Sequence, residues 1–104
     1  MLEIKLQSKW IAKLEKDLRN CWIMKATVTN KAGAPDAILI YKGRAVAIEF
    51  KIHPNKLSMK QEYERTLLLN AGALYFVVDQ FTDYKKTLET INAKCPGFYH
   101  VQDI

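Results

Sequence analysis

The spacing of apolar and charged residues predicts an amphipathic helix over residues 3–20. At about 100° per residue, one side collects the apolar side chains Trp10, Ile11, Leu14, Leu18 and Cys21. The opposite side collects Lys5, Lys9, Lys13, Lys16 and Arg19. Such a basic stripe is either a solvated face or a surface that meets phosphate groups. Glu3 falls on the apolar side, where it either complements the helix dipole or reaches towards a site under the helix.

Short apolar segments between turn residues predict the strands Trp22–Val28, Asp36–Tyr41, Arg44–Lys51 and Ala73–Asp79. Lys42-Gly43 joins the second and third segments as a hairpin. Because both faces of this hairpin are apolar, we expect it to be a central element that is covered on two sides.

Two further helices complete the predicted order of elements. One opens at Ser58 and runs to about Asn70, and the other runs from Thr82 to about Lys94. A last edge strand is predicted over Phe98–Val101. A helix between two strands is typical of a crossover into a parallel pair. We therefore expect an α/β fold in a single domain of residues 1–104, a mixed sheet flanked by helices in the order α-β-β-β-α-β-α-(β).

Composition and charge narrow the class of protein. A chain of 104 residues with 49% apolar residues is typical of one globular domain, and its apolar runs are far too short to span a bilayer. Cys21 and Cys95 are isolated, which favours reduced thiols in the cytoplasm over a disulfide framework or a zinc site. The net charge of +5 comes from the first half of the chain, so a nucleic acid is the first candidate partner.

The hairpin brings charged residues together at its open end. With a two-residue turn, Tyr41 faces Arg44 and Asp36 faces Glu49. Facing residues have Cβ atoms roughly 4.5–5.5 Å apart, and Lys51 shares their face because strand side chains alternate. A bulged turn would shift this register by one residue.

Two carboxylates in a partly buried place repel each other and lose hydration. A divalent cation such as Mg²⁺ or Mn²⁺ resolves both problems, since hard oxygen ligands suit it, and it could hold a phosphate oxygen and activate a water molecule. Lys51 could then orient the water or stabilise charge on the phosphate. A structural carboxylate–lysine ion pair at a sheet edge is an equally open interpretation.

An ordered set of motifs resembles a known family. The set is Gly33-x-Pro35-Asp36, a hairpin with Gly43, Ile48-Glu49-Phe50-Lys51, Ser58-x-x-Gln61, and Ala71-Gly72-Ala73 before an apolar strand. It resembles the virus-type replication-repair nuclease (VRR-NUC) domain of the PD-(D/E)XK nuclease superfamily. The resemblance extends over residues 3–80 when the first helix is included, and the last quarter of the chain agrees only in its layout.

The resemblance implies a role for each matching residue. Asp36 and Glu49 would be metal ligands together with the main-chain carbonyl of Phe50, Lys51 would be the catalytic lysine, and Gln61 would lie near the site. Glu3 would contact the metal directly or through water. The implied reaction is Mg²⁺- or Mn²⁺-dependent hydrolysis of phosphodiester bonds. As nucleic-acid contacts we expect Lys5, Lys9, Lys31 and Lys56.

Some residues at or near these motifs also have an ordinary structural interpretation. Ser58 and Gln61 also form a capping box, in which the glutamine side chain serves the helix end. His53 is either loop surface or a phosphate contact. Tyr75 is assigned to packing.

The stand-alone phage and bacterial members that the chain resembles are homodimers that cut four-way DNA junctions. The leading hypothesis is therefore a dimeric, structure-selective DNA endonuclease that resolves Holliday junctions. Leu67, Leu68 and Leu69 point in three directions on their helix, which favours cover by a partner chain. One alternative is a less selective nickase or a nuclease subunit of a larger phage replication or restriction assembly. Another is a non-catalytic nucleic-acid-binding module.

Overall fold

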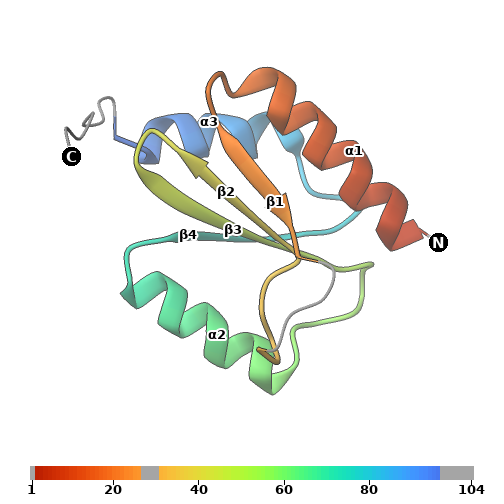
Figure 1. Cartoon of the computed structure of the whole chain (residues 1–104). Coiled ribbons are helices and arrows are strands. Elements are labelled where there is room, and N and C mark those ends of the chain that lie inside the picture. The colour runs from red at the N-terminus through yellow and green to blue at the C-terminus, as the bar shows by residue number, and fades with distance from the viewer. Residues whose placement is uncertain (1, 27–30, 97–104) are drawn as a thin grey trace.

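Three helices and a four-stranded mixed sheet form the computed structural model, which describes residues 2–26 and 31–96 (Figure 1). The elements in chain order are α1 (Leu2–Asp17), β1 (Trp22–Lys25), β2 (Ala37–Tyr41), β3 (Arg44–Phe50), α2 (Met59–Asn70), β4 (Leu74–Val78) and α3 (Tyr84–Lys94). The predicted α/β class and the order of seven elements are confirmed. The predicted edge strand over residues 98–101 lies outside the described residues, as does the predicted end of the first strand.

The strands lie in the order β1-β2-β3-β4. The first three are antiparallel, and β3 pairs with β4 in parallel after the α2 crossover. Tyr41 pairs with Arg44 and Ala37 with Ile48, which is the register of a two-residue turn. Lys42 has φ 48° and Gly43 has φ 80°, and two positive φ angles define the type I′ turn that matches strand twist. The hairpin register is therefore as predicted, without a bulge.

One face of the sheet carries the hydrophobic core. Alternate residues of the central strands point to this face and are fully buried, among them Leu39, Ile48 and Phe50. Helices α1 and α3 cover it, and they contribute Leu14 and Ile91 (Figure 1). The apolar stripe predicted for the first helix is thus the surface that packs on the sheet.

The opposite face is covered only in part. Helix α2 lies on this side and packs on β4 (Figure 1). On β1 and β2 the side chains of the same face stay open, with Trp22 54%, Met24 45% and Ile40 45% exposed. The prediction that the hairpin is covered on two sides is correct for β3 and wrong for β2. A single helix about 10 Å wide covers about two strands spaced 4.8 Å apart, and within residues 2–26 and 31–96 no second helix lies beside α2.

Helix α1 ends earlier than the periodicity predicts. Asn20 adopts φ 62°, a left-handed conformation that commonly follows the last turn of a helix. The chain then turns directly into β1. In the described ranges, every helix is too short or too polar to cross a membrane.

Candidate active site

Asp36 lies immediately before β2, at the open end of the hairpin. Its Oδ2 atom accepts a hydrogen bond from the backbone N–H of Phe50 at 2.8 Å. Its own carbonyl accepts one from Ala26 N–H at 2.8 Å. The side chain therefore joins the start of β2 to the end of β3, which fixes the carboxylate beside Glu49.

Glu49 is a buried carboxyl group on the face that α2 covers, with only 3% of its surface exposed. Its Oε2 atom accepts a hydrogen bond from Gln61 Nε2 at 3.0 Å and lies 4.0 Å from Lys51 Nζ. Its Oε1 atom is buried and has no hydrogen-bond partner among the described residues. A buried oxygen of this kind is costly unless a ligand completes it.

The environment strongly favours the neutral form of Glu49. Burial, first of all, and then the neighbouring carboxyl group of Asp36 raise the pKa of Glu49 to about 8. Lys51 acts in the opposite direction and Glu3 adds a smaller increase in this pKa. At neutral pH Glu49 therefore keeps its proton. Displacing that proton requires a positive charge between the two carboxyls, so the donor set fits a hard divalent cation.

Lys51 follows β3 directly. Its backbone N–H donates to Val78 O at 2.9 Å, which continues the parallel pairing with β4 by one residue. Strand alternation puts its side chain on the same face as Glu49, and the side chain is 19% exposed. The amine therefore borders the carboxyl pair and still reaches solvent, where a substrate phosphate would arrive.

Gln61 serves the helix end and the carboxyl pair at once. Its Oε1 atom accepts a hydrogen bond from Ser58 N–H at 2.8 Å, while Ser58 Oγ accepts one from Gln61 N–H at 3.2 Å. This completes a capping box at the start of α2. The remaining Nε2 donor reaches Glu49. The capping and site interpretations are therefore compatible, because one amide has a donor and an acceptor that point to different partners.

Gly33 sets the distance between the loop before β2 and helix α2. Its φ is +82°, and a Cβ atom at this position would lie 2.5 Å from the carbonyl oxygen of Lys60. The loop backbone therefore packs directly on the first turn of α2. That contact holds Asp36, on the loop side, at a fixed distance from Gln61, on the helix side.

Among solved structures, a chain described as a VRR_NUC domain is similar to this one. The TM-score is 0.69 at 24% sequence identity, and the similarity covers 89% of this chain and 96% of that chain. The chain has the VRR_NUC fold. No protein-family model and no curated protein matches the sequence. The predicted resemblance is thus confirmed at the level of the fold.

Within this VRR_NUC fold, Glu3 lies in the first turn of α1, and its charge acts on the pKa of Glu49. No three Asp, Glu, His or Cys side chains in the described ranges form a group that could hold a metal ion alone. The structure thus brings together Asp36, Glu49, Lys51 and Gln61, with Glu3 as a more distant charge.

The four predicted nucleic-acid contacts lie on separate parts of the VRR_NUC fold. Lys5 and Lys9 line a cavity of about 290 Å³ with Ile52, the residue after Lys51. Lys31 forms an ion pair with Glu64 of α2 at 3.4 Å. Lys56 is exposed in the loop before α2.

Tyr75 is a residue at the site that the sequence interpretation missed. Its hydroxyl is buried with no hydrogen-bond partner in the described part of the chain, and burial followed by the charge of Glu49 raises its pKa to about 12. Tyr75 lies on β4 and pairs with Ala47 of β3, and Val77, two residues further along β4, pairs with Glu49. The alternation of β4 against β3 is the signal that could have placed this hydroxyl near the carboxyl pair.

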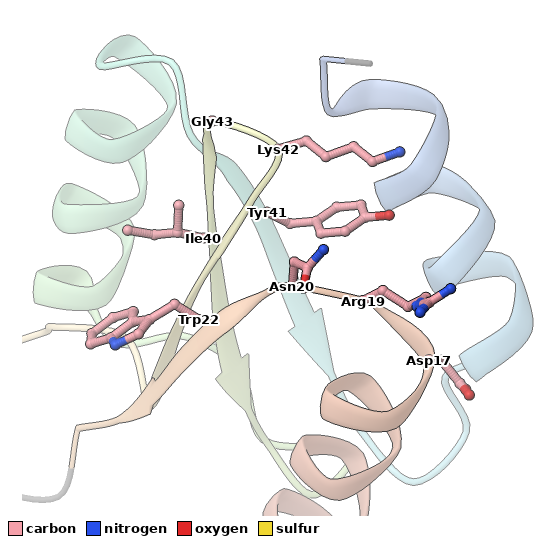
Figure 2. A pocket seen from close by; sticks show the side chains of 8 residues that line it. All are labelled: Asp17, Arg19, Asn20, Trp22, Ile40, Tyr41, Lys42 and Gly43. Carbon is pink, nitrogen blue, oxygen red and sulfur yellow. The ribbon is translucent and has the colours of Figure 1, made fainter. Parts of the chain in front are cut away.

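A larger cavity lies elsewhere in the VRR_NUC fold. It measures about 800 Å³ and is lined by Asp17, Arg19, Asn20, Trp22, Ile40, Tyr41, Lys42 and Gly43. Figure 2 shows Trp22 and Ile40 pointing to one side of the sheet and Tyr41 and Lys42 to the other. The cavity follows the turn end of the hairpin, whereas Asp36 and Glu49 lie at its open end. The size of a cavity therefore does not identify the candidate active site.

Proposed function

We propose that this chain is a divalent-metal-dependent nuclease that hydrolyses phosphodiester bonds in DNA. The observation that carries the proposal is the buried Glu49 carboxyl, which has one unpartnered oxygen beside Asp36 and lies 4.0 Å from the Lys51 amine. Two carboxylates and an amine in this arrangement suit a cation and a phosphate group, not a purely structural ion pair. The VRR_NUC fold supports the same class of reaction.

Asp36 and Glu49 would hold Mg²⁺ or Mn²⁺ together with the main-chain carbonyl of Phe50. The bound cation would supply charge stabilisation at the phosphate and a water molecule of lowered pKa. Gln61 fixes the Glu49 side chain through one hydrogen bond to Oε2, which would leave Oε1 available to the cation. Glu3 would contribute through water.

Lys51 would bind and orient the reacting groups. Its amine carries three donors and no acceptor, so it can donate to a phosphate oxygen and to the attacking water. Because its side chain is only 19% exposed, much of the competing bulk water is excluded from the amine. A fixed donor of this kind stabilises the charge that develops on the phosphate and needs little reorganisation.

For the substrate we propose branched DNA, with the four-way junction as the leading case, cut by a homodimer. The exposed side chains Trp22, Met24, Ile40 and Leu67 favour cover by a second copy of the chain. A two-fold dimer suits a junction because it presents two sites to two opposed strands. The basic first half of the chain, including Lys5, Lys9, Lys31 and Lys56, supports contact with the DNA backbone.

The test is cleavage of labelled four-way junction, splayed-arm and linear duplex DNA in Mg²⁺, Mn²⁺ or EDTA. Wild type is compared with Lys51→Ala and with Lys85→Ala, a matched lysine control on the exposed face of α3. We expect paired nicks in the junction, a rate loss of at least about 100-fold in Lys51→Ala, and no loss in Lys85→Ala.

Other outcomes separate the remaining candidates. Equal cutting of all three DNAs would favour the less selective nickase. Cutting only after a further protein is added would favour the nuclease subunit of an assembly. DNA binding without any metal-dependent cutting would refute catalysis and leave a nucleic-acid-binding module.

A further inference from the structure

The turn after β4 presents an aromatic ring to solvent. Phe81 is 73% exposed, although phenylalanine is among the residues most often buried. The turn lies at the carboxyl end of β4, and the parallel partner of that strand, β3, ends at Glu49 and Phe50. The exposed ring is therefore at the same edge of the sheet as the candidate active site.

The backbone that carries this ring is held in place. Phe81 N–H donates to Asp79 Oδ1 at 2.8 Å, and the Thr82 hydroxyl donates to the same oxygen at 3.2 Å. The Thr82 hydroxyl also accepts a hydrogen bond from Asp79 N–H at 2.9 Å. The turn thus holds the Phe81 backbone in one conformation, and only two side-chain torsions remain to be ordered when a ligand binds.

A second aromatic ring supports the first. The His53 and Phe81 rings lie edge to face, with centroids 5.5 Å apart at 73°. Gln80, the residue before Phe81, accepts a hydrogen bond from His53 N–H at 2.9 Å and donates one to His53 O at 3.5 Å. The segment after β3 is thereby joined to the turn after β4. Since His53 is two residues beyond Lys51, the aromatic pair is tied to the catalytic strand.

Basic residues flank the same place. Gln80 and Ile52, the neighbours of Phe81 and His53 in sequence, line the cavity of about 290 Å³ that Lys5 and Lys9 complete from α1. Two lysines of α1, which lie beside Leu2 and Leu6 in this lining, the Phe81 turn and the Lys51 amine therefore lie at one edge of the sheet. Proteins that bind exposed nucleobases combine cations that follow the phosphates with an aromatic ring on which a base stacks.

We propose that Phe81, supported by His53, stacks on an unpaired nucleobase of DNA next to the cleaved phosphate. The inference rests on the proposed nuclease function and adds to it a source of selectivity. In a continuous duplex, neighbouring base pairs cover both faces of every base. At a branch point or in a single strand a base face is open, so the ring binds such DNA and gains nothing from plain duplex.

Binding without cleavage tests this directly. Fluorescence anisotropy in EDTA gives the dissociation constant for a splayed-arm DNA and for a linear duplex of the same length. The variants are Phe81→Ala, Phe81→Trp and, as a matched control, Tyr63→Ala, which removes a ring that is 64% exposed on α2. Thermal unfolding shows that each variant is folded.

We expect Phe81→Ala to weaken binding of the splayed-arm DNA about 10- to 100-fold, the range found when a stacking aromatic is truncated. Phe81→Trp should bind the splayed-arm DNA as tightly as wild type does. The affinity of Phe81→Ala for linear duplex, and the affinity of Tyr63→Ala for either DNA, should change less than about twofold. The inference would be overturned if Phe81→Ala lost the same affinity for both DNAs, or if Phe81→Trp bound the splayed-arm DNA as weakly as Phe81→Ala.

The two proposals fail separately. If wild type cuts DNA and Phe81→Ala cuts and binds splayed-arm DNA as wild type does, stacking is refuted and the nuclease stands. If wild type cuts nothing with Mg²⁺ or Mn²⁺ while binding depends on Phe81, the stacking surface stands and the nuclease is refuted.

Discussion

Replacing Gly33 by alanine separates the contact between the loop and helix α2 from ordinary backbone strain. Gly33 has φ +82° and Gly43 has φ +80°, so alanine meets the same unfavourable left-handed conformation at both positions. At Gly43 no atom of the described residues, its chain neighbours aside, lies within 4 Å of the added Cβ, whereas at Gly33 the carbonyl oxygen of Lys60 lies at 2.5 Å. Gly43→Ala is therefore the matched control for Gly33→Ala.

The structure sets the size of the difference. Left-handed strain costs about 1–2 kcal/mol in both variants. An ordinary contact begins at 3.4 Å, so Gly33→Ala must also move the loop and the first turn of α2 apart by 0.9 Å. We expect about 1–3 kcal/mol of additional destabilisation from this overpacking. The same displacement would lengthen the 3.0 Å hydrogen bond from Gln61 to Glu49 beyond its limit.

Urea unfolding and cleavage of branched DNA measure the two effects. We expect Gly33→Ala to be less stable than Gly43→Ala and to lose about tenfold in rate under conditions where both variants are folded, because the Glu49 carboxylate is no longer fixed. If the two variants unfold at the same urea concentration and cut DNA equally, the loop–helix contact does not position the site and the reasoning is refuted.

Two further predictions concern stability. Because the pKa of Glu49 is raised from 4.5 to about 8, the folded chain retains a proton that the unfolded chain has lost. In EDTA its contribution to the free energy of unfolding is therefore full below pH 4.5 and is lost as pH rises through 8, by a few kcal/mol at ~1.4 kcal/mol per pKa unit. Urea unfolding should show wild type losing stability relative to Glu49→Gln between pH 5 and pH 8, and parallel profiles would contradict the raised pKa. Arg44 donates from Nε to Gly72 O at 2.9 Å and from Nη1 to Lys94 O at 2.7 Å. Arg44→Lys keeps the charge but cannot make both bonds, so thermal unfolding should show a loss of about 1 kcal/mol, and an unchanged midpoint would mean that water replaces the lost bond.

The register of the hairpin was predictable because strand alternation and a two-residue turn leave one way to pair Tyr41 with Arg44. The φ of 48° at Lys42 was not a local preference of lysine. Lys42 adopts this φ because β2 and β3 can pair in their observed register only when the turn has that conformation. The proximity of Asp36, Glu49 and Lys51 follows from the same pairing.

Other features depend on contacts that no local pattern records. Whether α2 covers β2 depends on where the helix crosses the sheet. Because α2 packs on β4, Ile40 of β2 stays exposed. Gln61 was assigned either to a helix cap or to the site, because neither its spacing from Ser58 nor the motif shows that one amide can reach both. Phe81 lay between the predicted strand Ala73–Asp79 and the predicted helix that begins at Thr82, and its contact with His53 depends on the two strand ends lying side by side.

The type I′ hairpin also determines how little chain entropy the candidate site costs. The Asp36 side chain contacts the backbone of Phe50, which is only 14 positions further along the chain. The cost of closing a loop grows with the logarithm of its length, so a short segment brings the two carboxyls together at a small entropic cost. That cost is met by strand pairing within the hairpin itself. The repulsion between the two acids is thus imposed by pairing within one hairpin, and distant segments such as α1 and α3 need only support it.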